Sequence, residues 1–398
     1  PRMQTGKAAC HDRVHAGSIP AGAIRIRRII MSVLDRLFSL IPMEQIEQSA
    51  QKQIFDVLRL DCLKSLAVMP DVHAGYDLCI GGVALLDGVI SPSFVGYDIG
   101  CGMCFIDTGV KSAEMFKGGR GDMEDVQQKI LSSVPTGFSS LPSPTEEMVY
   151  RHEHLPKNVS GRVKEKSRQQ LGTLGGGNHF IEIGENRSGN VCVTIHSGSR
   201  NVGHTLGGYY MRQGRMFPLD SELGRSYQAD LQFSLEWALE NRKQMLVQIL
   251  KALGLGYKAK KLIAGMVNEN HNHAVVTADG VLHRKGATPA DLGQIGIIPA
   301  NMRDGVYITR GLGNARYLSS ASHGCGRRMG RNQAKKSLSL NQFVSQMKEI
   351  VSIADKTTLD EAPDAYKDIN EVLAAQEGVV IEVVDFVRPL INIKAQGD

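Results

Sequence analysis

The sequence predicts a mixed α+β protein, built as a single large domain in which β-sheets are flanked by helices. Strand-like runs rich in β-branched residues, such as NVCVTIH, are mixed irregularly with helical patterns along the chain. No repeat of fixed period and no clear linker divides the chain. With 398 residues, 42% of them hydrophobic and 22% charged, the chain has the composition of a globular protein with a full core.

We assign this domain to residues 31–398 and treat residues 1–30 separately. The first thirty residues carry six Arg or Lys and a single acidic residue, Asp12. They are rich in Gly and Ala and lack amphipathic periodicity, so they do not enter the fold prediction. We expect a flexible basic extension, a cloning artefact or a segment upstream of a start at Met31.

The first part of the domain is predicted to contain a helix followed by strands. Apolar residues at helical spacing predict helical structure from Met31 to Ser65. The next run, LAVM, predicts a short strand that Pro70 closes, with Asp71 and His73 in the following loop. The run GGVALLDGVI predicts a β-hairpin that turns at its Asp-Gly pair, residues 87–88.

The rest of the domain continues the mixture. Residues 135–170 are polar and predict a surface excursion with a helix after Val159. The segments LGTLGGGNHFIEI and NVCVTIH each predict a strand, the first after a glycine loop. A leucine stripe predicts a helix over residues 228–253, stopped by Gly254. A polar loop entering a strand is predicted over residues 267–276, and a strand at the final PLINIK.

Composition sets limits on function. The net charge of +5 permits a basic patch for nucleic acid without requiring one. The longest apolar runs are too short to cross a bilayer, so we expect no membrane partner. Seven cysteines without a disulfide-scaffold spacing favour a reducing compartment, with metal-binding or catalytic use. We therefore expect a cytoplasmic protein.

Candidate metal ligands stand at strand ends or in glycine turns. Each alone is weak, because a single histidine is more often structural and a lone cysteine is more often a small buried side chain. Together they offer carboxylate, thiolate and imidazole donors suited to Mn, Zn, Fe or Co, and one thiolate can bridge two cations. These residues are Asp98 and Cys101 in VGYDIGCGMC, with His179, His196 and His271. A redox pair at CGMC is disfavoured because no helix follows its first cysteine.

Glycine loops and arginines next to these positions suit phosphate groups. The stretch GTLGGGNHF could cradle an oxyanion with its backbone N–H groups, although its glycines could equally serve only to turn the chain. It lacks the Lys-Ser/Thr of a P-loop and opens no helix, so neither a Walker nor a Rossmann site is predicted. Arg200, Arg327 and Arg331 add guanidinium groups near the same loops. Phosphate chemistry at a metal site is favoured.

Nine motifs, in order, resemble the RtcB family of RNA-splicing ligases. They are MPDVHAG, VGYDIGCGM, LGGGNHFIEI, HSGSR, GQIGIIP, RGLGN, SHGCGR, AYKDI and INIK, and they extend from Met69 to Lys394. The resemblance implies an RtcB-type fold and an RNA ligase that depends on GTP and two Mn²⁺ ions. Such a ligase joins an RNA 2′,3′-cyclic phosphate or 3′-phosphate end to a 5′-hydroxyl end through a histidine–GMP intermediate and RNA(3′)pp(5′)G.

The resemblance also implies a metal set in which Cys101 is the bridge. One metal takes Cys101, His179 and His196, and the other takes Asp98, Cys101 and His271. The HNHA segment departs from the usual family sequence, so His273 is the alternative to His271.

The resemblance further assigns the nucleotide site. His323 is the catalytic nucleophile, and Arg200 is a candidate for holding an RNA phosphate. Tyr76 stands where the family often has a lysine after the MPDVHAG motif, and Val306 stands where a polar contact is expected. The implied guanylate contacts are Asn178, His179, Phe180, Ile181, Glu182, His271, Asn272, Pro299, Ala300, Asn301, Met302, His323, Gly324, Cys325, Gly326 and Lys394.

Two other functions compete with the ligase. One is a two-metal phosphohydrolase or nuclease that forms no guanylate adduct, and the other is a non-catalytic RNA-binding paralogue. The departures at Tyr76 and Val306 and the modest charge favour RNA repair by a divergent bacterial-type paralogue over tRNA splicing. We expect a monomer.

Overall fold

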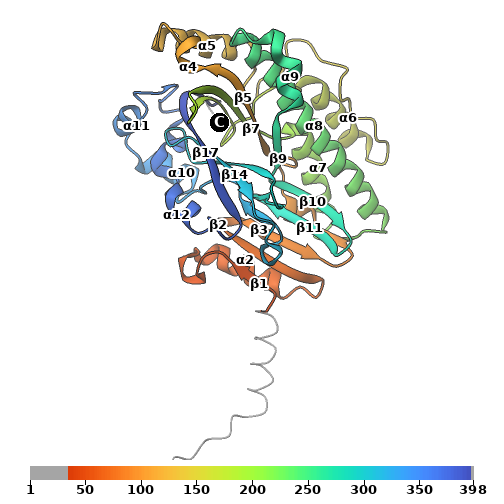
Figure 1. Ribbon diagram of the computed structural model, residues 1–398. Helices are drawn as coiled ribbons and strands as arrows, with labels where there is room; N and C mark the ends of the chain where they lie inside the picture. The colour runs from red at the N-terminus through yellow and green to blue at the C-terminus, as the bar shows by residue number, and fades with distance from the viewer. Residues whose placement is uncertain (1–34, 396–398) are drawn as a thin grey trace, which may run out of the picture.

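The computed structural model describes residues 35–395. The basic segment over residues 1–30 therefore lies outside the described part, as do residues 31–34 and 396–398. The architecture combines helices with several β-sheets, which confirms the predicted α+β class (Figure 1). Among the described residues, no helix has both the length and the apolar composition that a membrane crossing requires.

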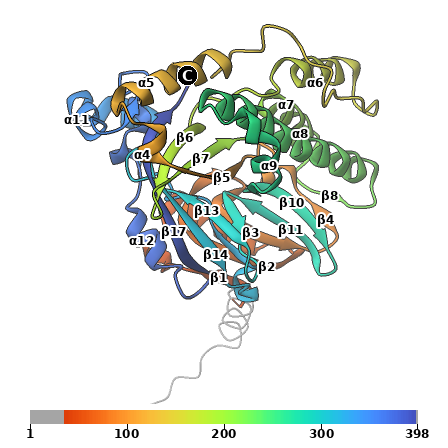
Figure 2. The ribbon, with the colours of Figure 1, turned by 45° about the horizontal axis from the view of Figure 1, so that its top comes forward.

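The larger sheet has eight strands and lies between two hydrophobic clusters. Its path is β13-β14-β17-β6-β7-β5-β9, with β16 paired to β17 outside this path. One face packs on α5 (Arg120–Ser133), α8 (Glu222–Ala252) and α9 (Ala259–Ala264). The other face curves around a second cluster that includes Phe180 and Cys192 (Figure 2). The strands are β5 (Gly102–Lys111), β6 (Phe180–Asn186), β7 (Asn190–Ser197), β9 (Val267–Asn270), β13 (Ile295–Pro299), β14 (Val306–Gly311), β16 (Val351–Ser352) and β17 (Ile381–Ile393).

A second sheet of five strands has the order β1-β2-β3-β11-β10. Helix α2 (Gln48–Leu58) covers it, with Ile54 and Leu58 buried against the strands. Two short pairs, β4 with β8 and β12 with β15, complete the strands. The bounds are β1 (Leu37–Ser39), β2 (Leu63–Tyr76), β3 (Leu78–Leu86), β4 (Val89–Ile90), β8 (Phe217–Pro218), β10 (Asn272–Thr277), β11 (Gly280–Lys285), β12 (Ala287–Pro289) and β15 (Ser320–Ser322).

The remaining helices surround the sheets. Helices α6, α7 and α8 pack together around a cluster that contains Trp237. Helices α10, α11 and α12 lie in the C-terminal part (Figure 1). Their bounds, with those of the short helices, are α3 (Pro92–Val95), α4 (Ser112–Met115), α6 (Lys157–Gln169), α7 (Arg200–Gln213), α10 (Arg331–Ser337), α11 (Leu340–Gln346) and α12 (Ile369–Ala374).

The strongest periodic signals give the expected elements. The helix predicted over residues 228–253 is α8, which begins earlier because the Ser221 hydroxyl accepts a hydrogen bond from the Gly224 N–H and caps it. It ends before Gly254, whose φ of 74° suits a glycine after a helix. The predicted strands ending at His196 and at the C-terminus are β7 and β17, and the helix after Val159 is part of α6.

The prediction for residues 31–75 was wrong in two places. Within the described part, strand β1 and a short turn precede α2, so the helix does not fill residues 31–65. Strand β2 continues past Pro70 to Tyr76, which puts Asp71 and His73 in a strand and not in a loop. The pairing of β2 with β3 is irregular between Val68 and His73. A proline is tolerated there because no regular ladder bond requires its missing N–H.

Two further strand predictions need correction. Residues 87–88 do turn the chain, but β4 pairs with β8 and does not return onto β3. Both edges of β3 are already occupied, by β2 and β11, so no hairpin can form there. Residues 267–270 are the strand β9 and not a loop, and only His271 separates β9 from β10.

Candidate active site

Four neighbouring strands of the larger sheet bring the predicted metal ligands to one edge. Strands β5 and β6 begin at this edge whereas β7 and β9 end there, because these neighbours are antiparallel. The register places Met103 opposite His196 and Gly102 opposite Asn270. The residues at these strand ends are Cys101 before β5, His179 before β6, His196 near the end of β7 and His271 after β9.

The side chains converge on the Cys101 sulfur. Its Sγ lies 3.2 Å from Nε2 of His179 and 3.2 Å from Nε2 of His196. The Nε2 atoms of His196 and His271 are 3.2 Å apart, and Nε2 of His179 lies 3.0 Å from Oδ2 of Asp98. All five residues of the predicted metal set therefore meet at one place.

The protonation of these groups suits metal binding. His196 directs Nδ1 at the Asn178 carbonyl oxygen, 3.1 Å away, so the N–H is placed there and the Nε2 lone pair points at the cluster. Burial lowers the pKa of His196 and of His271 well below the usual range, which keeps both imidazoles neutral. Burial and the Asp98 carboxylate raise the pKa of the Cys101 thiol, and a bound divalent cation would reverse this shift. The residues present fit a divalent metal.

The grouping of donor atoms differs from the one that the family resemblance implies. One group of closely spaced donors is Asp98, Cys101 and His179, and the other is Cys101, His196 and His271. Cys101 belongs to both groups, as the bridging role requires, whereas His179 and His271 exchange places relative to the prediction. The alternative ligand His273 lies in β10 with Nε2 3.3 Å from the Arg284 guanidinium and is not in either group.

Backbone geometry explains the glycines of VGYDIGCGMC. Gly100 has a φ of 71°, which a residue with a side chain adopts at a cost, and this turn brings Cys101 back toward Asp98. The Cys101 N–H donates to the Asp98 carbonyl oxygen at 3.1 Å. Cys104 is fully buried in the core beneath α8, which agrees with a structural role. The cysteines in the described part are all free thiols.

Arg242, on α8, hydrogen-bonds to the strand ends that carry the donor cluster. Its guanidinium is fully buried and donates to the carbonyl oxygens of Gly100 and Ser197, at 3.1 and 2.6 Å. It also donates to the side-chain oxygens of Asn268 and Asn270, each at 2.8 Å. One side chain thus ties together segments next to three predicted ligands. The sequence analysis missed it, although a charge on the leucine stripe of α8 was a signal.

His323 lies next to this cluster, and Asp71 orients it. Asp71 Oδ2 lies 2.6 Å from His323 Nδ1 and also accepts from the His323 backbone N–H at 3.2 Å. With the proton held at Nδ1, the Nε2 lone pair remains available for nucleophilic attack. The His323 ring packs on the His271 ring, with centroids 4.8 Å apart. The irregular part of β2 that was mistaken for a loop therefore supplies the partner of the predicted nucleophile.

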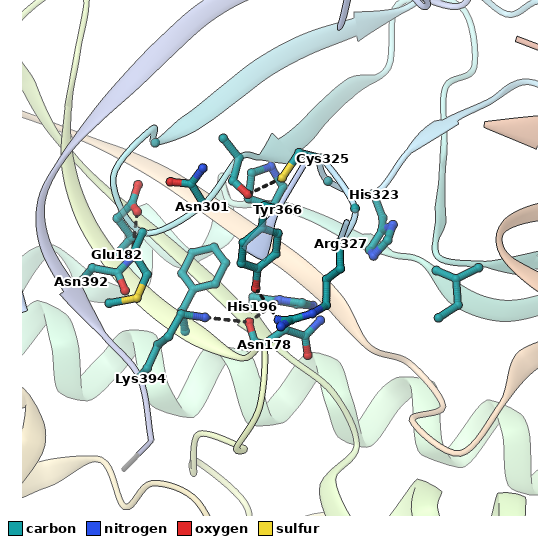
Figure 3. A pocket seen from close by; sticks show the side chains of 18 of the residues that line it. Asn178, Glu182, His196, Asn301, His323, Cys325, Arg327, Tyr366, Asn392 and Lys394 are labelled. Carbon is teal, nitrogen blue, oxygen red and sulfur yellow. Dashed lines mark hydrogen bonds between the residues drawn. The ribbon is translucent and has the colours of Figure 1, made fainter. Parts of the chain in front are cut away.

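A cavity of about 270 Å³ extends from His323. In Figure 3, His323 is on one side of the pocket, and Glu182, Asn392 and Lys394 are on the other. Twelve of the predicted guanylate contacts line it: Asn178, Phe180, Glu182, Pro299, Ala300, Asn301, Met302, His323, Gly324, Cys325, Gly326 and Lys394. Arg327 and Arg331, singled out in the sequence for phosphate, line it as well.

Four predicted contacts do not line this cavity. Ile181 alternates with Phe180 and Glu182 along β6 and packs into the core on the other face, so its side chain does not line the cavity. His179 belongs to the metal cluster. His271 and Asn272 line the neighbouring groove on the other side of His323.

The far end of the pocket combines a carboxyl group with amide and ammonium groups. Glu182 Oε2 accepts from Asn392 Nδ2 at 2.9 Å, whereas its Oε1 is buried without a partner in the described structure. Burial raises the pKa of Glu182 to about 8. Lys394 Nζ donates to Glu361 Oε2 at 2.7 Å. Burial alone would raise the pKa of Glu361, but the charges of Lys394, Arg331 and Arg327 outweigh it and lower this pKa to about 2. Asn392 and Tyr366 are lining residues that the sequence analysis did not select, although both stand in quoted motifs.

Arg200 stands at the start of α7, beside the metal cluster. It lines a surface groove together with Asp98 and His179. Its backbone φ is 55°, and its Nε donates to the Thr173 hydroxyl at 3.1 Å. This position is compatible with the predicted contact to an RNA phosphate.

A third group of metal-type donors lies outside the predicted site. His152, His154 and Asp230 come within ligand distance of one another. Asp230 is fully buried, and both of its oxygens are already bonded, to the two histidines and to the hydroxyls of Tyr150 and Tyr210. We interpret this group as a structural hydrogen-bond network.

The fold and the site together define a class: a mixed α+β protein with a candidate metal centre beside a nucleotide-sized pocket. The model of the family described as tRNA-splicing ligase RtcB matches residues 53–395, and the chain belongs to this RtcB family. RNA-splicing ligase RtcB1 from Escherichia coli is 32% identical over 393 residues, which cover 88% of this chain and 95% of that protein. The tRNA-splicing ligase RtcB from Aeropyrum pernix is 30% identical, with 85% of this chain and 90% of that protein covered.

Proposed function

We propose that this chain is an RNA ligase that uses GTP and Mn²⁺ to join an RNA 2′,3′-cyclic phosphate or 3′-phosphate end to a 5′-hydroxyl end. The observation that carries the proposal is the position of His323. Its Nδ1 is bonded to Asp71, and it stands between a nucleotide-sized pocket and the five-residue donor cluster. Curated relatives that cover most of the chain are named RNA-splicing ligases, which supports the same reaction.

The pocket chemistry favours guanine as the base. The unpaired Oε1 of Glu182 is an acceptor in an otherwise bonded corner. Guanine offers a ring N–H and an exocyclic amino group on one edge. Donation from both would favour the ionised form of Glu182 and offset the burial that raises its pKa, so that its carboxylate can accept them. Adenine presents no such adjacent donors on its pairing edge. The Lys394 ammonium, which lines the same pocket, can donate to the guanine O6.

His323 then takes the guanylyl group. Its Nε2 attacks the α-phosphorus of GTP, the bond to the β-phosphate oxygen breaks, and pyrophosphate leaves. Arg327 and Arg331 line the pocket and are candidates for phosphate contacts. Bound Mn²⁺ ions, held by Asp98, Cys101, His179, His196 and His271, would neutralise phosphate charge and activate water for opening a cyclic phosphate.

Two transfers complete the proposed reaction. The RNA 3′-phosphate displaces His323 and takes the guanylyl group, which gives RNA(3′)pp(5′)G. The 5′-hydroxyl of the second strand then attacks the activated phosphate, a 3′–5′ phosphodiester forms, and GMP leaves. Arg200, beside the cluster, is the candidate to hold an RNA phosphate. We propose broken RNA as the substrate, in a repair role.

Labelled GTP tests this proposal directly. Incubation of the protein with Mn²⁺ and GTP labelled at the α-phosphate should give an acid-labile labelled adduct. His323→Ala should abolish the adduct. His152→Ala should retain it, because His152 is a partly exposed histidine that belongs neither to the pocket nor to the donor cluster. Absence of an adduct with every divalent metal tried would overturn the ligase proposal and favour a phosphohydrolase.

A further inference from the structure

Three aromatic rings form a row outside the metal cluster. The Tyr76 and Tyr97 rings meet edge to face, with centroids 5.4 Å apart and planes at 77°. The Tyr97 and His204 rings are stacked, with centroids 5.0 Å apart and planes at 24°. Tyr76 is 62% exposed and His204 is also exposed, so rings at both ends of the row face solvent. Single exposed rings are common on protein surfaces, whereas a contiguous row of rings can mark a binding surface.

This row lies where the surface grooves around the site meet. Tyr97 and His204 line each of three neighbouring grooves. One of these, of about 710 Å³, leads from Tyr76 and Tyr97 to Cys101 and His323. Tyr97 is also the residue directly before the predicted ligand Asp98. An RNA end that reaches Cys101 and His323 through this groove must pass these three rings.

The Tyr76 ring is held in place by the fold. It stands at the tip where β2 turns into β3, and the turn residue Asp77 has a φ of 52°. The Asp77 carboxylate forms an ion pair with Arg215, with 3.3 Å between Oδ2 and Nε. The buried Lys285 ammonium lies 5.5 Å from the centroid of the Tyr76 ring and also donates to the Tyr76 carbonyl oxygen. An exposed ring that is pre-positioned in this way loses little conformational freedom when a flat ligand stacks on it.

Positive charge flanks the row. Arg162 from α6 and Arg212 from α7 are both exposed and line the outer groove together with Tyr76 and His204. Helices α6 and α7 lie side by side (Figure 1). Arg162 and Arg212 line the same groove, so both guanidinium groups are on one surface. Aromatic faces for bases, next to cations for the backbone, are the combination by which proteins bind single-stranded nucleic acid without reading its sequence.

We propose that Tyr76, Tyr97 and His204 form a stacking platform for a nucleobase next to the RNA break, with Arg162 and Arg212 contacting the backbone. This deepens the proposed function and rests on it for the identity of the reaction. Tyr76 occupies the position at which the family resemblance predicts a lysine, so the platform replaces a charge contact with a stacking contact. The base belongs to either the 3′-phosphate strand or the 5′-hydroxyl strand.

Binding of short single-stranded RNAs, one with a 3′-phosphate and one with a 5′-hydroxyl, tests the platform by fluorescence anisotropy. Tyr76→Leu should weaken binding of the stacked strand about fivefold to a hundredfold, the range for loss of one base stack. Tyr76→Trp should bind this strand as the wild type does, because tryptophan keeps an aromatic face for stacking. The matched control is Tyr257→Leu, because Tyr257 is 80% exposed and also lies beneath a lysine, 5.6 Å from its ring centroid. The control should bind RNA as the wild type does.

An abasic nucleotide at the end of each RNA identifies the strand. The wild type should lose affinity for the strand whose terminal base it stacks, and Tyr76→Leu should show no further loss with that abasic strand. Unchanged RNA binding by Tyr76→Leu, or an equal abasic loss in both proteins, would overturn the platform. Failure of the ligase proposal shows separately, as a missing GTP adduct in the wild type, and does not affect this RNA-binding comparison.

Discussion

Replacement of Arg242 by methionine should lower stability and metal affinity together. The buried guanidinium donates four hydrogen bonds within the edge that carries the donor cluster. Two of its acceptors are the carbonyl oxygens of Gly100 and Ser197, which are the neighbours in sequence of Cys101 and His196. Methionine fills much of the same volume but donates no hydrogen bond, so these oxygens would lose their partner while still buried.

The magnitude follows from two opposing terms. A hydrogen bond from a charged donor contributes about 1.5–3 kcal/mol, so loss of all four would cost about 6–12 kcal/mol if nothing compensated. Methionine also removes the desolvation penalty of a buried charge, which is several kcal/mol. We therefore expect the free energy of unfolding to fall by about 3–5 kcal/mol. Displaced ligand backbones should weaken Mn²⁺ binding about 10- to 100-fold.

Urea unfolding followed by the fluorescence of Trp237, the single tryptophan, measures the stability change. Trp237 is buried on the same helix, five residues before Arg242, and therefore reports on this part of the core. Lys243→Met is the matched control, since Lys243 is 38% exposed and should change stability by less than about 0.5 kcal/mol. A loss below about 1 kcal/mol in Arg242→Met, or an unchanged Mn²⁺ affinity, would refute the reasoning.

Three further predictions concern His323, the pocket and the donor cluster. Asp71→Asn should slow guanylate adduct formation about 10²–10⁴-fold, because an amide can donate to His323 Nδ1 and move the proton to Nε2; single-turnover labelling measures this. Burial raises the pKa of Glu182 to about 8, so the stability it gives the folded state is present below about pH 4.5 and is lost as pH rises through about 8. Glu182→Gln should therefore become more stable relative to the wild type across that range in urea unfolding, and an unchanged difference would contradict the shift. Mn²⁺ at a hundred times its Kd should stabilise the wild type by about 2.7 kcal/mol for each bound ion, and His271→Ala should lose the gain from the ion whose donor group includes His271 in a thermal-shift measurement.

The sequence was most informative where a residue's chemistry and its local pattern coincide. Glycines around Asp98 and Cys101, and histidines at strand ends, indicated a donor cluster before any fold was known. Antiparallel pairing then brings those strand ends to one edge. The division of the donors into two groups was not predictable in the same way, since it depends on ring orientations that the family resemblance does not specify for this chain.

The misses have a common physical cause, which is that pairing partners distant in sequence override local signals. Pro70 looks like the end of a strand, but an irregular stretch of the β2–β3 ladder accommodates it and places Asp71 against His323. Likewise, Arg242 reads as one of many charges on a long helix. Its role depends on the carbonyl oxygens of loops far away in sequence, and no local pattern specifies those loops.

The position of His271 explains how the donor cluster and His323 are kept at a fixed spacing. It is the one residue between β9 of the larger sheet and β10 of the smaller sheet. Its backbone N–H donates to the Cys101 carbonyl oxygen at 2.8 Å, and its ring contacts those of both His196 and His323. A shift of one sheet against the other would therefore change the donor spacing and the position of His323 at once. Because a strand junction sets this geometry, a substitution in the groove that leads to the site, such as one at Tyr76, is expected to leave the donor cluster and His323 in place.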